Sequence, residues 1–110
     1  MSDEPWIRAG ALAEIPEGEV RAFDLPWGRV AVAHVEHRLF AFADECTHAG
    51  CALSDGSFDD RVATITCAVD ESVFDVESGE PVAGPAQDPL VVHPARDVAG
   101  WVEISARPVG

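Results

Sequence analysis

Two short cysteine-containing segments constrain this chain more than any other feature. The first reads Cys46-Thr47-His48 and the second reads Cys67-Ala68-Val69-Asp70, with eighteen residues between them. Each segment pairs a thiol with a second donor, an imidazole or a carboxylate, and such groups are ligands for transition metals. The intervening residues are rich in glycine, aspartate and serine, which favours loops rather than core. The pattern therefore predicts two facing loops that hold one metal centre.

The length and composition set outer bounds. A chain of 110 residues can form one domain with one hydrophobic core. Three cysteines, an odd number, cannot form a full disulfide framework. The N-terminal residues Met1 to Pro5 are acidic and carry no apolar run, so we expect no signal peptide. No stretch approaches the ~20 apolar residues of a membrane helix. We therefore expect a soluble cytoplasmic protein in a reducing compartment, without membrane contact.

The net charge of −13 is large for a chain of this size. Such a charge argues against binding to nucleic acid or to anionic membranes and favours basic protein partners. Solubility alone is the other interpretation. Seven acids close in sequence to the two segments are candidates for steering a partner: Asp44, Glu45, Asp55, Asp59, Asp60, Asp70 and Glu71.

Alternating apolar and polar residues predict a series of β-strands without any long helix. The expected strands are 6–9, 20–25, 29–35, 39–43, 61–66, 72–76, 90–93 and 101–104. Residues 11–15 could form one helical turn, 82–89 are stiff and extended, and the last two strands are linked by a turn through Asp97 and Gly100. Strands at such regular spacing indicate an all-β sandwich or barrel.

The residues around both segments resemble the cluster-binding loops of Rieske-type [2Fe–2S] ferredoxins. The similar stretches are Cys46-Thr47-His48-Ala49-Gly50, Leu53-Ser54-Asp55-Gly56, Cys67-Ala68-Val69 and Phe74-Asp75-Val76-Glu77-Ser78-Gly79-Glu80-Pro81. With the flanking strands, the resemblance covers nearly the whole chain. It implies a single Rieske-like antiparallel β-sandwich over 1–110, with cluster-binding loops at about 44–72 inserted in a β base of 1–43 and 73–110. It also implies that the proline-containing segment 82–89 packs beside the cluster.

The resemblance also implies the ligands of the cluster. A Rieske cluster holds one iron with two thiolates and the other with two imidazoles. Cys46 and Cys67 match the thiolate positions, and His48 matches one imidazole. Asp70 stands where the family has its second histidine, and Glu71 stands where the family often has glycine. We therefore expect Cys46, His48, Cys67 and Asp70 to bind the [2Fe–2S] cluster.

The third cysteine, Cys51, falls where Rieske proteins of higher potential have a disulfide cysteine. The usual partner would lie near position 69, which is Val69 here, so no disulfide is expected. The remaining histidines are expected to be surface or strand residues, and the tryptophans to pack in the core or at sheet edges: His34, His37 and His93, and Trp6, Trp27 and Trp101. We expect His93 to be the histidine closest to reaching the site.

The resemblance implies an electron carrier and not an enzyme. Such a protein takes one electron from a flavin-dependent reductase and passes it to a terminal oxygenase, and a monomer suits that role. One alternative is a Rieske-fold interaction subunit that has lost its cluster, as in the small subunits of some nitrite reductases. Another is a mononuclear site of two thiolates, an imidazole and a carboxylate, a set that zinc accepts.

Overall fold

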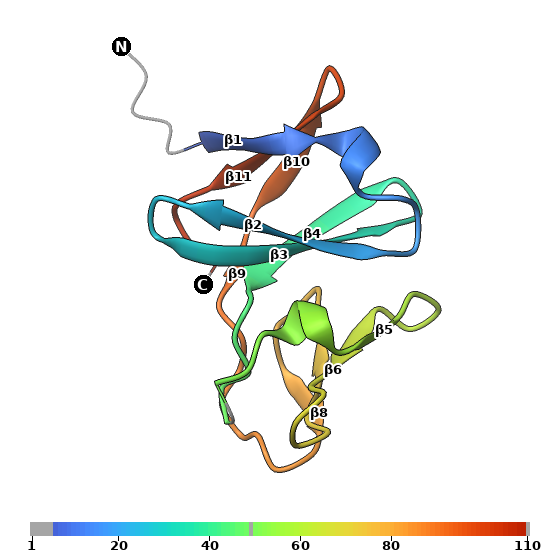
Figure 1. Ribbon diagram of the computed structural model, residues 1–110, viewed down its shortest axis with the longest axis vertical. Helices are drawn as coiled ribbons and strands as arrows, with labels where there is room; N and C mark the ends of the chain where they lie inside the picture. Colours follow the sequence, from blue (N-terminus) through green and yellow to red (C-terminus); the bar gives the residue numbers. More distant parts are fainter. Residues whose placement is uncertain (1–5, 49, 110) are drawn as a thin grey trace.

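A computed structural model describes residues 6–48 and 50–109 of the chain. Within these ranges the backbone forms three antiparallel β-sheets and two short 3₁₀ helices, η1 (Leu12–Glu14) and η2 (Leu53–Asp55). Figure 1 shows two of the sheets forming an upper unit and the third lying below them. The expected all-β architecture is thereby confirmed. Neither helix is long and apolar enough to cross a membrane.

Each sheet has a simple order of strands. The first, sheet A, has the order β1 (Trp6–Ala11), β11 (Trp101–Ser105) and β10 (Ala95–Val98). The second, sheet B, has the order β2 (Val20–Leu25), β3 (Gly28–Val35), β4 (Arg38–Ala43) and β9 (Val92–His93). The third, sheet C, has the order β5 (Ser57–Asp59), β6 (Thr64–Thr66), β7 (Val73–Asp75) and β8 (Pro81–Ala83).

Strand β3 contributes to two separate hydrophobic cores because successive side chains point to opposite faces of a sheet. Val30 and Val32 belong to the upper hydrophobic cluster, which we call the base core. Its other buried members are Ile15, which directly follows η1, and residues of β4 and β11: Ala41, Val102 and Ile104. Ala31 and Ala33 face the other way, toward sheet C. Sheet B is therefore the central layer of the molecule.

The second core lies between sheet B and sheet C and includes both predicted thiol ligands. Its buried members are Ala31, Ala33, Phe42, Cys46, Leu53, Ile65, Cys67, Phe74, Val76, Ala86 and Leu90. The small side chains of Ala31 and Ala33 leave room there for the rings of Phe42 and Phe74. We call this group the lower core. The two loops that carry Cys46 and Cys67, which we call the first and second ligand loops, are thus anchored in a packed hydrophobic core.

A two-residue turn joins the central pair of strands. Val35 pairs with Arg38 across Glu36 and His37, whose φ angles are +52° and +67°. Two left-handed residues in a two-residue loop match the right-handed twist of a β-hairpin. The β10–β11 hairpin closes in the same way, with φ values of +51° and +88° at Ala99 and Gly100.

The structure confirms most of the predicted elements and corrects several. All eight predicted strands overlap an observed strand, and η1 occupies the predicted helical turn. Asp97, expected in a turn, lies in β10 instead, because its pairing with Val102 continues the hairpin to Val98. Strands β5 and β8 were not expected. Pairing to β6 and β7 holds them extended although their sequences favour loops.

The segment between the two ligand motifs also contributes to the core, contrary to expectation. Leu53 is fully buried, and Ile65 is 1% exposed. Sheet C extends through β8 to Ala83, so strands after the second motif pair directly with strands before it. The division of the chain into cluster-binding loops at about 44–72 and a β base of 1–43 and 73–110 stays a prediction.

Candidate metal centre

The first ligand loop connects β4 to η2 and turns its thiol inward. The backbone N–H of Cys46 donates to the carbonyl oxygen of Cys51 over 2.9 Å, and the N–H of Gly50 donates to the Cys46 carbonyl oxygen over 2.9 Å. Cys46 is 2% exposed, whereas the side chain of His48 is 52% exposed. The loop therefore presents a thiol to the lower core and an imidazole to the surface.

The second ligand loop connects β6 to β7 and is closed in a similar way. The N–H of Cys67 donates to the Ser72 carbonyl oxygen over 2.8 Å, and the N–H of Glu71 donates to the Cys67 carbonyl oxygen over 3.0 Å. Glu71 has a φ of +63°. Glycine adopts this left-handed conformation at little cost, so the backbone explains why glycine suits this position.

Asp70 joins the two ligand loops. Its Oδ2 atom lies 2.7 Å from Nδ1 of His48, and both of its oxygens lie 3.8 Å from Sγ of Cys46. The N–H of Ser72 donates to Oδ1 of Asp70 over 3.0 Å. This hydrogen bond, with a further contribution from His48, lowers the pKa of Asp70 below its usual value, although burial acts in the opposite direction. The structure thus brings three of the four predicted ligands into direct contact through an ionised carboxylate.

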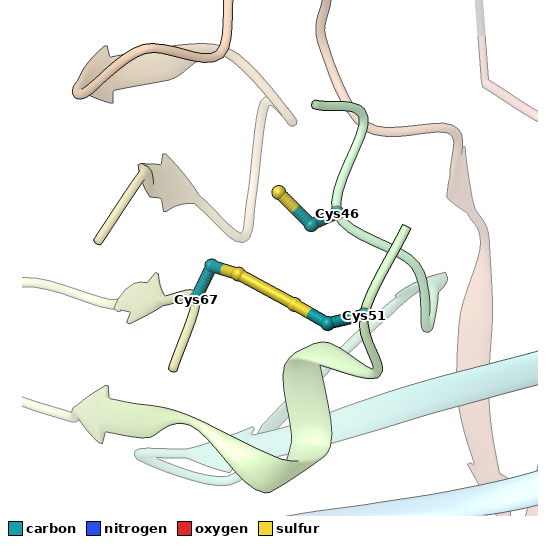
Figure 2. A group of neighbouring side chains, drawn as sticks. All are labelled: Cys46, Cys51 and Cys67. Atoms are coloured by element: carbon teal, nitrogen blue, oxygen red, sulfur yellow. A yellow bond between two sulfur atoms is a disulfide. The ribbon is translucent and has the colours of Figure 1, made fainter. Parts of the chain in front are cut away.

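The three cysteines converge beside this carboxylate. Their Sγ atoms all lie within 4.8 Å of one another, and Cys51 forms a disulfide with Cys67 (Figure 2). The expectation that Cys51 has no disulfide is therefore wrong. Val69, where a partner cysteine would have been expected, is 69% exposed, whereas Cys67 is 1% exposed and faces Cys51 inside the lower core. Position 69 therefore offers no thiol and lies at the surface, and the thiol that pairs with Cys51 is the buried one of Cys67.

The donor groups at this place fit a [2Fe–2S] cluster. Two thiols, an imidazole and a carboxylate from two loops converge, and these are groups that bind iron. The N–H of Val69 lies 3.4 Å from Sγ of Cys67 and would stabilise a thiolate there. Cys67 can take part only after its bond to Cys51 has been reduced to two thiols.

The segment from β8 to β9 packs beside both ligand loops, as expected. The Thr47 hydroxyl donates to the Asp88 carbonyl oxygen over 2.7 Å, and the N–H of Ala86 donates to Oγ of Ser72 over 3.1 Å. Gly84, with a φ of +104°, lies so near Ser72 that an added Cβ would be 2.5 Å from the Ser72 Cα atom. An open hollow of about 500 Å³ remains between this segment and His48.

The acids that surround the site differ from the expected set. Glu45, Glu71 and Asp88 are exposed, and Glu45 and Asp88 line the hollow beside His48. Asp44 is buried, and Asp60 lies near Glu17 and other residues of the base, in a separate hollow. These two acids therefore do not belong to the surface around His48.

The other histidines occupy the surface or strand positions expected of them, but two tryptophans do not: Trp27 and Trp101 are 37% and 41% exposed, and Trp101 lies on the central strand of sheet A. His93 does not reach the site, because its Nδ1 atom lies 2.9 Å from the Ser105 carbonyl oxygen and its ring packs 5.5 Å from the Trp27 ring. His34 contacts the Ile15 carbonyl oxygen over 2.8 Å. Arginine guanidinium groups lie over the remaining two indoles, Arg96 over Trp6 and Arg8 over Trp101.

The buried carboxylate of Asp44 supports the first ligand loop, a role that the sequence did not reveal. Its side chain is fully buried and accepts hydrogen bonds from the Ser54 N–H (2.7 Å), the Ser54 hydroxyl (2.6 Å) and Nε of Arg29 (3.0 Å). These contacts connect β3, the end of β4 and η2. They flank the loop that carries Cys46 and His48 on both sides.

The chain is similar to known proteins over most of its length. The model of a family described as the Rieske [2Fe-2S] domain matches residues 5–95. The anthranilate 1,2-dioxygenase ferredoxin subunit of Burkholderia cepacia is 32% identical over 100 residues, which cover 91% of each chain. The naphthalene 1,2-dioxygenase system ferredoxin component of Pseudomonas aeruginosa is 33% identical over 93 residues, covering 84% of this chain and 88% of the relative.

A solved structure adds a likeness in three dimensions. It is a complex of reduced oxygenase and oxidized ferredoxin in carbazole 1,9a-dioxygenase. One of its chains superimposes with a TM-score of 0.88 at 26% identity, covering 98% of this chain and 99% of that chain. The likeness extends over both the base and the ligand loops.

The Asp44 network leads to a prediction about stability. Asp44→Asn should lower the free energy of unfolding by about 1–3 kcal/mol, because a neutral amide cannot accept all three hydrogen bonds and leaves buried donors unsatisfied. Urea denaturation of the reduced chain measures the change. Asp60→Asn, at an exposed position away from this network, is the matched control and should change stability by less than about 0.5 kcal/mol. Equal effects of the two substitutions would contradict the supporting role.

Proposed function

The chain belongs to the Rieske [2Fe-2S] domain family, and we propose that it is the ferredoxin of a multicomponent dioxygenase system that hydroxylates aromatic rings. It is an electron carrier. The observation that supports this proposal most strongly is the convergence of Cys46, His48, Cys67 and Asp70 from two closed loops. A subunit that served only as an interaction surface would not need this set of donors.

The protein holds its thiols inside and its imidazole outside. When bound, a Rieske cluster accepts and releases one electron. In our proposal Cys46 and Cys67 would hold the cluster from the side of the lower core, and His48 and Asp70 would hold it from the side of the surface. Cys46 and Cys67 are almost fully buried, and half of the His48 side chain is exposed. A partner would therefore approach from the His48 side.

We infer that a flavin-dependent reductase supplies the electron and that a terminal oxygenase receives it. The carbazole dioxygenase structure contains an oxygenase and a ferredoxin in one complex, which supports an oxygenase as partner. The exposed acids near His48, namely Glu45, Glu71 and Asp88, favour a basic docking surface on that partner. A monomer suits a protein that moves between two partners. A cytoplasmic location also suits the proposal, because a reducing compartment keeps Cys51 and Cys67 as thiols.

The colour of the protein tests the cluster. Protein purified without air should be red-brown, and Cys46→Ser or Cys67→Ser should abolish the visible absorption because each substitution removes a thiolate ligand. Cys51→Ser should keep it, since Cys51 is outside the proposed ligand set. A colourless parent chain would favour the interaction subunit or the mononuclear site. Loss of colour in Cys51→Ser, with retention in Cys67→Ser, would overturn the ligand assignment.

Substitution of Asp70 tests the fourth ligand. We expect Asp70→His to raise the reduction potential, because a carboxylate places an extra negative charge beside the electron that is added. At an effective dielectric of 20 and a distance of 4 Å, this repulsion is about 4 kcal/mol. Since 1.4 kcal/mol corresponds to 59 mV for one electron, the expected rise is roughly 170 mV. Potentiometry on both proteins measures it.

The control for this experiment is the neighbouring acid. Glu71→Gln removes a negative charge from the same loop, but Glu71 is exposed and is not a proposed ligand. It should therefore shift the potential by only a small fraction of the Asp70→His shift. An unchanged potential in Asp70→His would refute ligation by the carboxylate.

Ionic strength tests the docking surface. The rate of electron transfer to the oxygenase should fall as salt rises, because the Debye length shrinks from ~10 Å at 0.1 M to ~3 Å at 1 M. Glu71→Gln and Asp88→Asn should weaken this salt dependence. Asp60→Asn should leave it unchanged, since Asp60 lies in a different hollow of the surface. A rate indifferent to salt would rule out electrostatic steering.

A further inference from the structure

The third cysteine gives this site more thiols than the proposed cluster uses. Cys46, Cys51 and Cys67 have all three Sγ atoms within 4.8 Å of one another. Figure 2 shows Cys46 and Cys51 together on the first-loop side of the site, with Cys67 opposite them. In a tetrahedral zinc site the Zn–S distance is ≈ 2.3 Å, which places neighbouring sulfurs ~3.8 Å apart. Once the Cys51–Cys67 bond is reduced and these two sulfurs move apart, three thiolates gathered within this distance can share one ion.

A fourth donor lies at a suitable distance from these sulfurs. The carboxylate oxygens of Asp70 are 3.8 Å from Sγ of Cys46. Zinc bound to one sulfur at ≈ 2.3 Å and to one oxygen at ≈ 2.0 Å in tetrahedral geometry places those two atoms ~3.5 Å apart. Asp70 therefore needs only a small movement to complete a tetrahedron.

The surroundings of Asp70 suit a metal ligand as well. Ligating carboxylates are commonly held by a hydrogen bond from a second residue. His48 Nδ1, 2.7 Å from Oδ2 of Asp70, can supply that bond, and the Ser72 N–H donates to Oδ1. The side chain of Asp70 is 13% exposed, and Cys46 and Cys67 are almost fully buried. The imidazole can thus orient the carboxylate without itself binding the ion.

We propose that the reduced, cluster-free chain binds one thiophilic divalent cation of the zinc class through Cys46, Cys51, Cys67 and the Asp70 carboxylate. The Cys51–Cys67 bond must first be reduced. A dithiol reagent supplies two electrons and two protons, the two cysteines become thiols, and the reagent becomes a disulfide. The ion and the cluster then compete for Cys46 and Cys67. Cys51 distinguishes the form with the single cation from the form with the cluster, because only the cation is proposed to bind to Cys51.

Cobalt(II) is the spectroscopic probe for this site. The full chain is first reduced and stripped of its cluster in the absence of air. It is then kept in a phosphine reductant and titrated with Co²⁺, after which Zn²⁺ is added to displace the cobalt. We expect one equivalent of cobalt with tetrahedral d–d bands, a charge-transfer band of three thiolates, and full displacement by zinc. Cys51→Ser should lose about a third of the charge-transfer intensity. Its affinity should fall at least tenfold, since even loss of a group that only supports a ligand costs 10–100-fold.

Matched variants make the result decisive. Asp70→Asn should weaken binding, whereas Glu71→Gln, which changes the adjacent exposed acid, should not. Cys51→Ala serves as a second variant that lacks only the Cys51 thiol, and circular dichroism checks that each chain keeps its β structure. X-ray absorption of the zinc form should give three Zn–S distances of about 2.3 Å and one shorter Zn–O distance. Absence of binding, unchanged binding in both Cys51 variants, or a zinc shell with only two sulfurs would overturn the proposal.

Discussion

The packing of two cysteine side chains into the lower core is the constraint on which the rest of the site depends. Cys46 and Cys67 are buried with Phe42, Leu53 and Phe74 between sheets B and C. Sheet B can support this second core because β3 is buried on both faces, with valines toward the base and alanines toward the loops. The two loops therefore meet as parts of one packed structure, and their donor atoms are held together before any metal arrives.

The electrostatics of the site follow from the direction in which each loop points its side chains. Thiols face the core, His48 faces solvent, and Asp70 lies between them in contact with both. The carboxylate is kept ionised by the Ser72 N–H and by His48. If Asp70 binds iron as we propose, its negative charge suits a carrier of low potential, and the exposed acids nearby suit a transient partner of opposite charge. The negative charges at the site thus bear on both the reduction potential and the docking of a partner protein.

Cys51 makes the chemistry of the site depend on its redox state. With Cys67 oxidised to the disulfide, one of the thiolates that we propose as ligands is missing. After reduction, Cys46, Cys51 and Cys67 offer three neighbouring thiols, of which the proposed cluster uses two. A reducing compartment favours the thiol state on which both metal forms depend.

Most of the strands and the donor groups that the two loops offer could be predicted from the sequence. Alternation in 20–25 and 29–35 reflects local periodicity, and the motifs around Cys46 and Cys67 are short enough to be recognised without a fold. Tertiary structure alone decided the burial of Asp44, the strands β5 and β8, and the pairing of Cys51 with Cys67 instead of a partner near Val69. Each of these depends on contacts between residues far apart in the chain. Local sequence specifies which groups are available, whereas burial and strand pairing determine which of them meet.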